Sequence, residues 1–226
     1  MNALLLSLVL APAAFAGVVT EDDIAAWVGE LAPQIEAETG RTFVEVPTVE
    51  IQDRATLRSL APSGFGRTFG PAEEVEFEVA LEGSFAMYLP GLQRIFVVKE
   101  SVEYAFARML DQQDTLAPFV RCAVAHELVH TLVDQRVRAE PTTSADGLRT
   151  MNEGVATFVG DRLCPVRRAR SLNRSFLGMD GLSSADPREP ASQRYGFAER
   201  YLRMVHASRG WLAVWAAVAD PPPLAV

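Results

Sequence analysis

The chain has 226 residues, of which 49% are hydrophobic, 22% charged and 8% aromatic. These values exclude a disordered chain, which would be poorer in apolar residues, and a disulfide-stapled miniprotein, which would hold more than two cysteines. The formal net charge of −8 argues against nucleic acid as a partner, because nucleic-acid-binding domains are usually basic. The length predicts a single domain with ample chain to bury a core.

The first residues predict a signal peptide. Residues 1–16 contain no charged side chain, and their apolar run over residues 3–10 is too short to span a bilayer. Ala14 and Ala16 flank Phe15 in the small-x-small pattern of a cleavage site, so we expect residues 17–226 to be the mature, secreted or periplasmic domain. The alternative is an apolar N-terminal helix. We expect no membrane span after cleavage, because no later stretch approaches about 18 consecutive apolar residues.

The first half of the chain predicts one helix followed by strands. Thr20 precedes an amphipathic pattern, so we expect it to cap a helix. A short helix is expected at 53–60 and a Gly/Pro/Ser loop at 61–71. Alternating apolar residues predict strands at 41–52, 74–80, 85–89 and 94–98. Strand 94–98 is a candidate edge on which an extended peptide could add a further strand.

The second half of the chain predicts helices. Their expected ranges are 100–111, 118–138, 148–163, 193–208 and 211–219. Because strands come first and helices second, we expect an α+β domain in which a small mixed sheet lies beside a helical half. Residues 167–190 predict a long, solvated polar connection.

Two of the three histidines form a short motif within the predicted helix 118–138. His126 and His130 are four residues apart, so both imidazoles project from one helix face, and Glu127 follows the first. Two imidazoles so placed can bind one tetrahedral Zn²⁺, with Glu127 as the general base for a water. The flanking residues are apolar almost all round, and burying these polar side chains without a metal or partners would be costly.

A catalytic zinc site needs a third protein ligand. Val133 and Arg136 occupy the positions where the metzincin pattern has glycine and histidine, so that class is excluded. Glu153 in the predicted helix 148–163 is the strongest candidate, and Gly154 beside it would permit close approach of this helix to the histidine helix. The weaker alternatives are Asp134, Asp146 and Asp161.

Residues 125–135 (AHELVHTLVDQ) and 152–157 (NEGVAT) resemble the gluzincin, or peptidase MA-like, zinc metallopeptidases. Residues 195–210 resemble the helix that follows the third ligand in small members of that group. The resemblance implies a zincin-like α+β fold and a peptidase that acts on peptides or proteins. It implies His126, His130 and Glu153 as zinc ligands and Glu127 as the base.

The chain departs from the thermolysin-like pattern at one position. Those enzymes place an aspartate four residues after the ligand glutamate to orient the first histidine, and this chain has Thr157 there. Asp134, one turn after His130, is therefore a candidate to orient the imidazoles.

Hydrolysis also needs a donor for the developing oxyanion. Gluzincins often use a tyrosine or histidine from a later helix, which makes Tyr195 the first candidate and His206 the second. The alternative for Tyr195 is a core tyrosine whose hydroxyl is satisfied elsewhere.

The two cysteines predict one disulfide. Cys122 lies one turn before His126, and Cys164 lies three turns after Glu153, on nearly the same face. If the two helices run antiparallel, the cysteines meet, and exported proteins fold where disulfides persist. The alternatives are two small buried residues or a metal-binding cysteine pair.

The sequence thus predicts an exported zinc peptidase. The rival interpretations are a catalytically silent zinc-binding scaffold or interaction protein, and a binding module with an incidental motif. Glu127 favours the enzyme, because a purely structural zinc site needs four protein ligands and no base.

Overall fold

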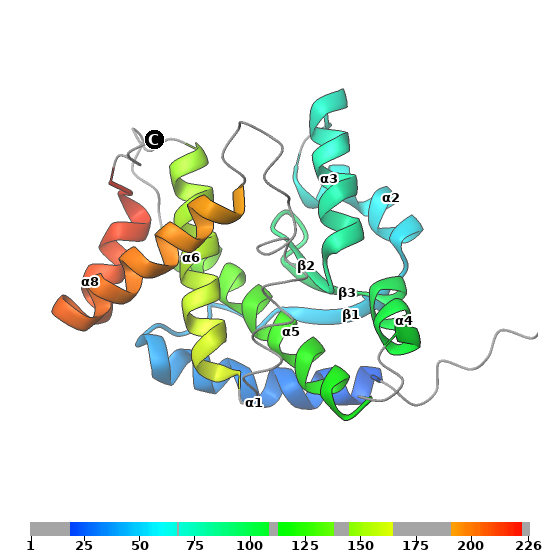
Figure 1. The fold of residues 1–226 in the computed structure, drawn as a ribbon, viewed down its shortest axis with the longest axis horizontal. Helices are drawn as coiled ribbons and strands as arrows, with labels where there is room; N and C mark the ends of the chain where they lie inside the picture. The colour runs from blue at the N-terminus through cyan, green and yellow to red at the C-terminus, as the bar shows by residue number, and fades with distance from the viewer. Residues whose placement is uncertain (1–18, 67, 109–112, 138–144, 165–190, 223–226) are drawn as a thin grey trace, which may run out of the picture.

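A computed structural model describes residues 19–66, 68–108, 113–137, 145–164 and 191–222 (Figure 1). The expected signal peptide at residues 1–16 and the expected connection at 167–190 lie outside the described residues. The fold is mixed α+β and mostly helical, with one small sheet, as the order of the sequence patterns predicted.

The sheet has three strands, β1 (Thr48–Gln52), β2 (Ala86–Leu89) and β3 (Arg94–Val98), in the order β1-β3-β2. β1 pairs with β3 in parallel, and β2 pairs with β3 in antiparallel orientation. The prediction that 94–98 forms an edge strand is therefore wrong. β3 is central because the chain crosses over after β1 and returns with β3 beside it, which leaves β2 at the edge.

Seven helices surround the sheet in the described residues. They are α1 (Glu21–Thr39), α2 (Arg54–Gly64), α3 (Pro71–Gly83), α4 (Lys99–Arg108), α5 (Gln113–Arg136), α6 (Ala145–Leu163) and α8 (Ala191–Ala219). Thr20 caps α1 as predicted, in a reciprocal capping box with Asp23. α8 contains a non-helical residue, Gly210 with φ 72°, which separates the two helices predicted there.

The predicted strand at 74–80 is wrong, because these residues belong to α3. Val75, Phe77 and Val79 alternate with acidic residues, which imitates the period of a strand. In the helix, Phe77 and Leu81 lie four residues apart and are buried, while Val75 and Val79 remain exposed. Pro71 in the first helical turn and Glu73 in the capping box favour the helix.

The predicted strand at 41–52 is shorter in the structure, because only its second half pairs with β3. The segment before Thr48 is held by α5 instead. The Gln135 side chain accepts a hydrogen bond from Val44 N (2.8 Å), and the Arg136 guanidinium donates to the Thr42 carbonyl (2.5 Å).

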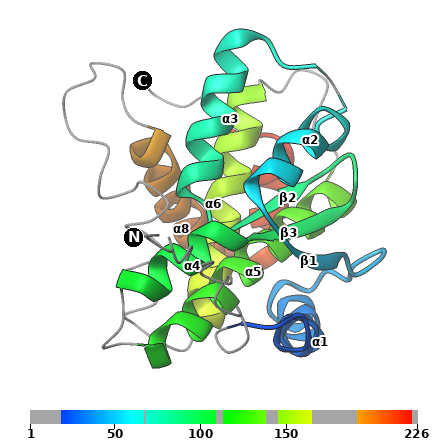
Figure 2. The ribbon, with the colours of Figure 1, turned by 90° about the vertical axis from the view of Figure 1, so that its right-hand side faces the viewer.

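The two faces of the sheet contribute to two apolar clusters. Ile95 and Val97 of β3 point into the main core, which α1, α5, α6 and α8 complete. Phe96 and Val98 point the other way, into a smaller cluster under α2 and α3. Figures 1 and 2 show α2 and α3 on one side of the sheet and α1 on the other.

Helix α5 runs through the main core. Its segment Leu116–Arg136 is long and apolar enough to cross a membrane by length and composition alone, and 78% of the apolar window is buried inside the protein. The core helix of a globular protein has the same properties.

Candidate metal centre

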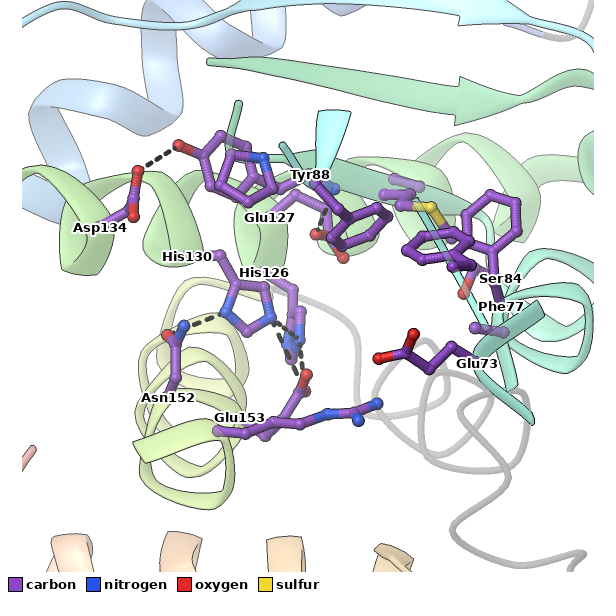
Figure 3. Close-up of a pocket in the computed structure, with 17 residues that line it drawn as sticks. Glu73, Phe77, Ser84, Tyr88, His126, Glu127, His130, Asp134, Asn152 and Glu153 are labelled. Atoms are coloured by element: carbon purple, nitrogen blue, oxygen red, sulfur yellow. Dashed lines mark hydrogen bonds and ion pairs between the residues drawn. The ribbon is translucent and has the colours of Figure 1, made fainter. Parts of the chain in front are cut away.

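The two imidazoles of the HExxH motif face α6 from the middle of α5. Nε2 of His126 lies 3.0 Å from Nε2 of His130, and the two residues are only 3% and 9% exposed. Because they are four residues apart, one helix face presents both nitrogens to the same point. Figure 3 shows both rings converging at the edge of a cavity.

Glu153 of α6 reaches the same point. Its Oε2 lies 3.4 Å from Nε2 of His126 and 3.7 Å from Nε2 of His130. Burial raises the pKa of Glu153, but the opposing effects of His130 and His126 prevail and lower it to about 2, so the carboxylate is ionised. Donors about 2.0–2.2 Å from one tetrahedral metal ion lie roughly 3.3–3.6 Å apart, and the three observed separations of 3.0, 3.4 and 3.7 Å lie around this range, so the three donors could share one ion.

Glu127 lies beside these donors, and a residue of the sheet hydrogen-bonds to its carboxylate. Atoms of His126, Glu127 and His130 that could ligate a metal all lie within 4.8 Å of one another. The backbone N–H of Tyr88 in β2 donates to Oε2 of Glu127 (2.9 Å). Burial raises the pKa of Glu127 to about 7, helped by the nearby charge of Glu153 and opposed by His130 and the Tyr88 N–H.

Asn152 orients one of the imidazoles. Its Oδ1 lies 3.0 Å from Nδ1 of His130, so a proton on Nδ1 leaves Nε2 free to ligate a metal. Nδ1 of His126 is buried and has no hydrogen-bond partner within the described part of the chain.

The prediction that Asp134 orients the imidazoles is wrong. Its carboxylate accepts hydrogen bonds from the Tyr88 hydroxyl (2.9 Å) and from the Gln93 amide (2.6 Å). The sequence analysis missed Asn152, although an amide residue beside the candidate ligand Glu153 is a usable signal for such a partner.

Of the other candidates, the structure describes the side chains of Asp161 and His206, and neither points to this position. Asp161 pairs with Arg203 of α8 (3.1 Å), and the side chain of Asp146 lies outside the described part of the structure. The side chain of Tyr195 is likewise not described, so its role stays a prediction. His206 packs its ring against Phe158 and Trp211.

Two features join α5 to α6 around the site. The predicted disulfide between Cys122 and Cys164 is present, with the Cα atoms 5.6 Å apart. Gly160 lies against His126, where an added Cβ would be 3.8 Å from the histidine Cα. Gly154 does not serve this contact, contrary to the prediction, because it faces Ala198 of α8.

The candidate ligands open into a cavity of about 470 Å³. Figure 3 shows His126, His130 and Glu153 on one side, Glu127 and Tyr88 beside them, and Phe77 and Glu73 opposite. The arrangement could hold one metal ion between α5 and α6 at the wall of the cavity.

Comparisons of the chain with models of protein families, with curated proteins and with solved structures found no match. The disulfide agrees with an oxidising compartment.

Proposed function

We propose that the protein is an exported zinc peptidase with gluzincin-type ligation. The observation that carries this proposal is the convergence of His126, His130 and Glu153, with Glu127 beside them at the wall of a cavity. A structural zinc site would need a fourth protein ligand and no adjacent base.

The donor set fits zinc in its chemistry. Two neutral imidazoles and one carboxylate are a common three-ligand set for catalytic zinc, and they leave a coordination position free. Zinc held there would supply Lewis acidity toward a water molecule and a substrate carbonyl. Asn152 would keep His130 in the ligating tautomer.

Glu127 would move the proton during hydrolysis. Its raised pKa suits a carboxylate that accepts a proton from the attacking water and returns it to the departing amine. The Tyr88 N–H of the edge strand β2 hydrogen-bonds to one oxygen of the Glu127 carboxylate. This contact orients the carboxylate at the wall of the cavity. Tyr195 is kept as the proposed donor to the oxyanion.

The edge strand β2 is the proposed track for the substrate backbone. Three of its residues, Ala86, Met87 and Tyr88, line the cavity, and within the described residues β2 pairs only with β3. An extended peptide could therefore add along its other side, pairing with backbone groups other than the Tyr88 N–H, which Glu127 accepts. We therefore propose strand addition at β2, since β3 is the central strand.

The decisive experiment combines metal analysis with a base variant. We expect the mature protein to hold about one zinc per chain and to cleave a peptide library or an unfolded test protein. Glu127→Gln should keep the zinc and lower cleavage by roughly 10²-fold or more, because the amide cannot accept the proton. His126→Gln should lose zinc, whereas His206→Gln, a matched control outside the cavity, should retain it.

The outcomes separate the rival interpretations. Zinc without any cleavage by the wild type would identify a silent scaffold, and a protein without stoichiometric zinc would identify a binding module with an incidental motif. Export is tested separately by N-terminal sequencing of the protein released from expressing cells, which should begin at Gly17.

A further inference from the structure

Three phenylalanine rings form a continuous wall of the cavity opposite the candidate ligands. Phe65, Phe69 and Phe77 all line it, and each ring contacts the other two. The ring centroids are 5.3 Å apart for Phe65 and Phe69, 6.0 Å for Phe65 and Phe77, and 5.5 Å for Phe69 and Phe77. We refer to these three residues as the aromatic wall.

The aromatic wall is anchored at its base and accessible at its rim. Phe77 is 9% exposed and belongs to the smaller apolar cluster, with Phe69 and Met87 packed against that cluster. Phe65 is 36% exposed, so part of its ring is accessible from the cavity that it lines.

Two glycines fix the position of Phe65. An added Cβ on Gly64 would be 2.8 Å from a methyl carbon of Leu89, and one on Gly91 would be 2.5 Å from the Ser63 carbonyl oxygen. The Gly91 N–H also donates to the Gly64 carbonyl (2.6 Å). The end of α2 is thus packed closely against the β2–β3 turn. Phe65 follows directly after Gly64, so this packing constrains the position of its ring beside the cavity.

We propose that the aromatic wall is the subsite for a bulky apolar side chain, aromatic or branched aliphatic, adjacent to the bond that is cleaved. This inference rests on the proposed function and names the substrate class of the same site. The partly exposed rings lie in the same cavity as the candidate ligands. When an apolar substrate side chain covers them, their surface is removed from water, which makes binding more favourable. Because such side chains are buried in folded proteins, the substrates are extended or unfolded polypeptides.

The rings favour an apolar occupant over a cation. A cage for an ammonium group needs ring faces that surround an open space, whereas these rings pack against one another at 5.3–6.0 Å. Glu73 is the α3 carboxylate that lines the cavity, and it already accepts the Gly70 N–H (2.9 Å) as part of the cap of α3.

The test measures binding of peptide hydroxamates to the zinc-loaded protein, because these probes need no turnover. The hydroxamates carry a phenylalanyl, alanyl or lysyl side chain on either side of the zinc-binding group. In the favoured position, we expect the phenylalanyl probe to bind about 10-fold or more tightly than the alanyl probe. Phe65→Ala and Phe69→Ala should each lower this preference by about fivefold, without changing zinc content or alanyl binding.

Val79→Ala is the matched control. It removes an apolar side chain from the same helix as Phe77, but Val79 is 59% exposed and does not line the cavity. We avoid Phe77→Ala because it would open the smaller core. The subsite would be overturned if the phenylalanyl and alanyl probes bind equally, or if the lysyl probe binds most tightly. It would also be overturned if the preference survives both phenylalanine variants, or if no probe binds.

Hydrolysis is measured in parallel so that the two proposals fail separately. Preferential phenylalanyl binding without cleavage of any library peptide would support the subsite and refute the peptidase. Cleavage without a preference for bulky apolar residues beside the scissile bond would support the peptidase and refute the subsite.

Discussion

Oδ1 of Asn152 lies 3.0 Å from Nδ1 of His130, so the residue before the candidate ligand Glu153 also orients a second candidate ligand. One turn of α6 therefore supplies both the Glu153 carboxylate beside the two imidazoles and the Asn152 oxygen that accepts a hydrogen bond from one of them. The two roles do not conflict, because neighbouring helix positions point in different directions.

The first prediction concerns this contact. Asn152→Ala removes the acceptor for Nδ1–H of His130, so zinc affinity should fall by about 10–100-fold. Competition with a chromophoric chelator measures the affinity. Asn152→Asp keeps an acceptor and should bind zinc far more tightly than the alanine variant. Equal zinc affinity in wild type and Asn152→Ala would show that the hydrogen bond between Asn152 and His130 does not contribute to metal binding.

The elements of the site were predictable because their signals are local. The spacing of His126 and His130 fixes a shared helix face whatever the rest of the fold does. Glu153 required one further step, the approach of a second helix, and the disulfide prediction required the same antiparallel geometry. The structure joins Cys122 to Cys164 and brings the Glu153 carboxylate to the imidazoles, so both predictions drew on one arrangement.

The features that the sequence analysis missed depend on distant partners. In α3, alternation of Val75, Phe77 and Val79 carries a strand period, and only packing of the Phe77 face on the smaller core selects the helix. The central place of β3 depends on the crossover from β1, which leaves no trace in the five residues of β3. Likewise, the partner of Gly154 is Ala198 of α8, which lies more than forty residues away in the sequence.

A second prediction concerns pH. Asp53 caps α2, and the hydrogen bond from the Thr56 backbone N–H (2.7 Å) lowers the pKa of Asp53 below its usual value. A group whose pKa is lowered by folding stabilises the protein above its unfolded-state pKa, and the effect is lost as the pH falls through the folded-state pKa. Wild type should therefore unfold at a higher temperature than Asp53→Asn at pH 7, and the difference should begin to shrink below about pH 4 and be lost as the pH falls through the lower folded-state pKa. A difference that persists undiminished at pH 2.5 would contradict this account.

The third prediction concerns the disulfide. It closes a loop of 42 residues that contains all three candidate ligands. Loop entropy predicts that the double variant Cys122→Ala/Cys164→Ala loses about 4 kcal/mol of unfolding free energy, measured by urea denaturation. Reductant should destabilise the wild type by a similar amount and leave the double variant unchanged. Free thiols in the unfolded, unreduced wild type would refute the bridge.

The last prediction compares two glycines of α6. An added Cβ on Gly154 would be 2.7 Å from the Ala198 Cβ and 2.9 Å from the Ala198 carbonyl carbon, so α8 would have to shift. Gly154→Ala should therefore destabilise the protein by about 1–3 kcal/mol. Gly160→Ala is the matched control, because its Cβ would meet His126 no closer than 3.8 Å, an ordinary contact. Since alanine favours a helix interior over glycine, Gly160→Ala should be neutral or stabilise by up to about 1 kcal/mol. Urea denaturation measures both values, and equal destabilisation by the two variants would show that contact with α8 is not what requires Gly154.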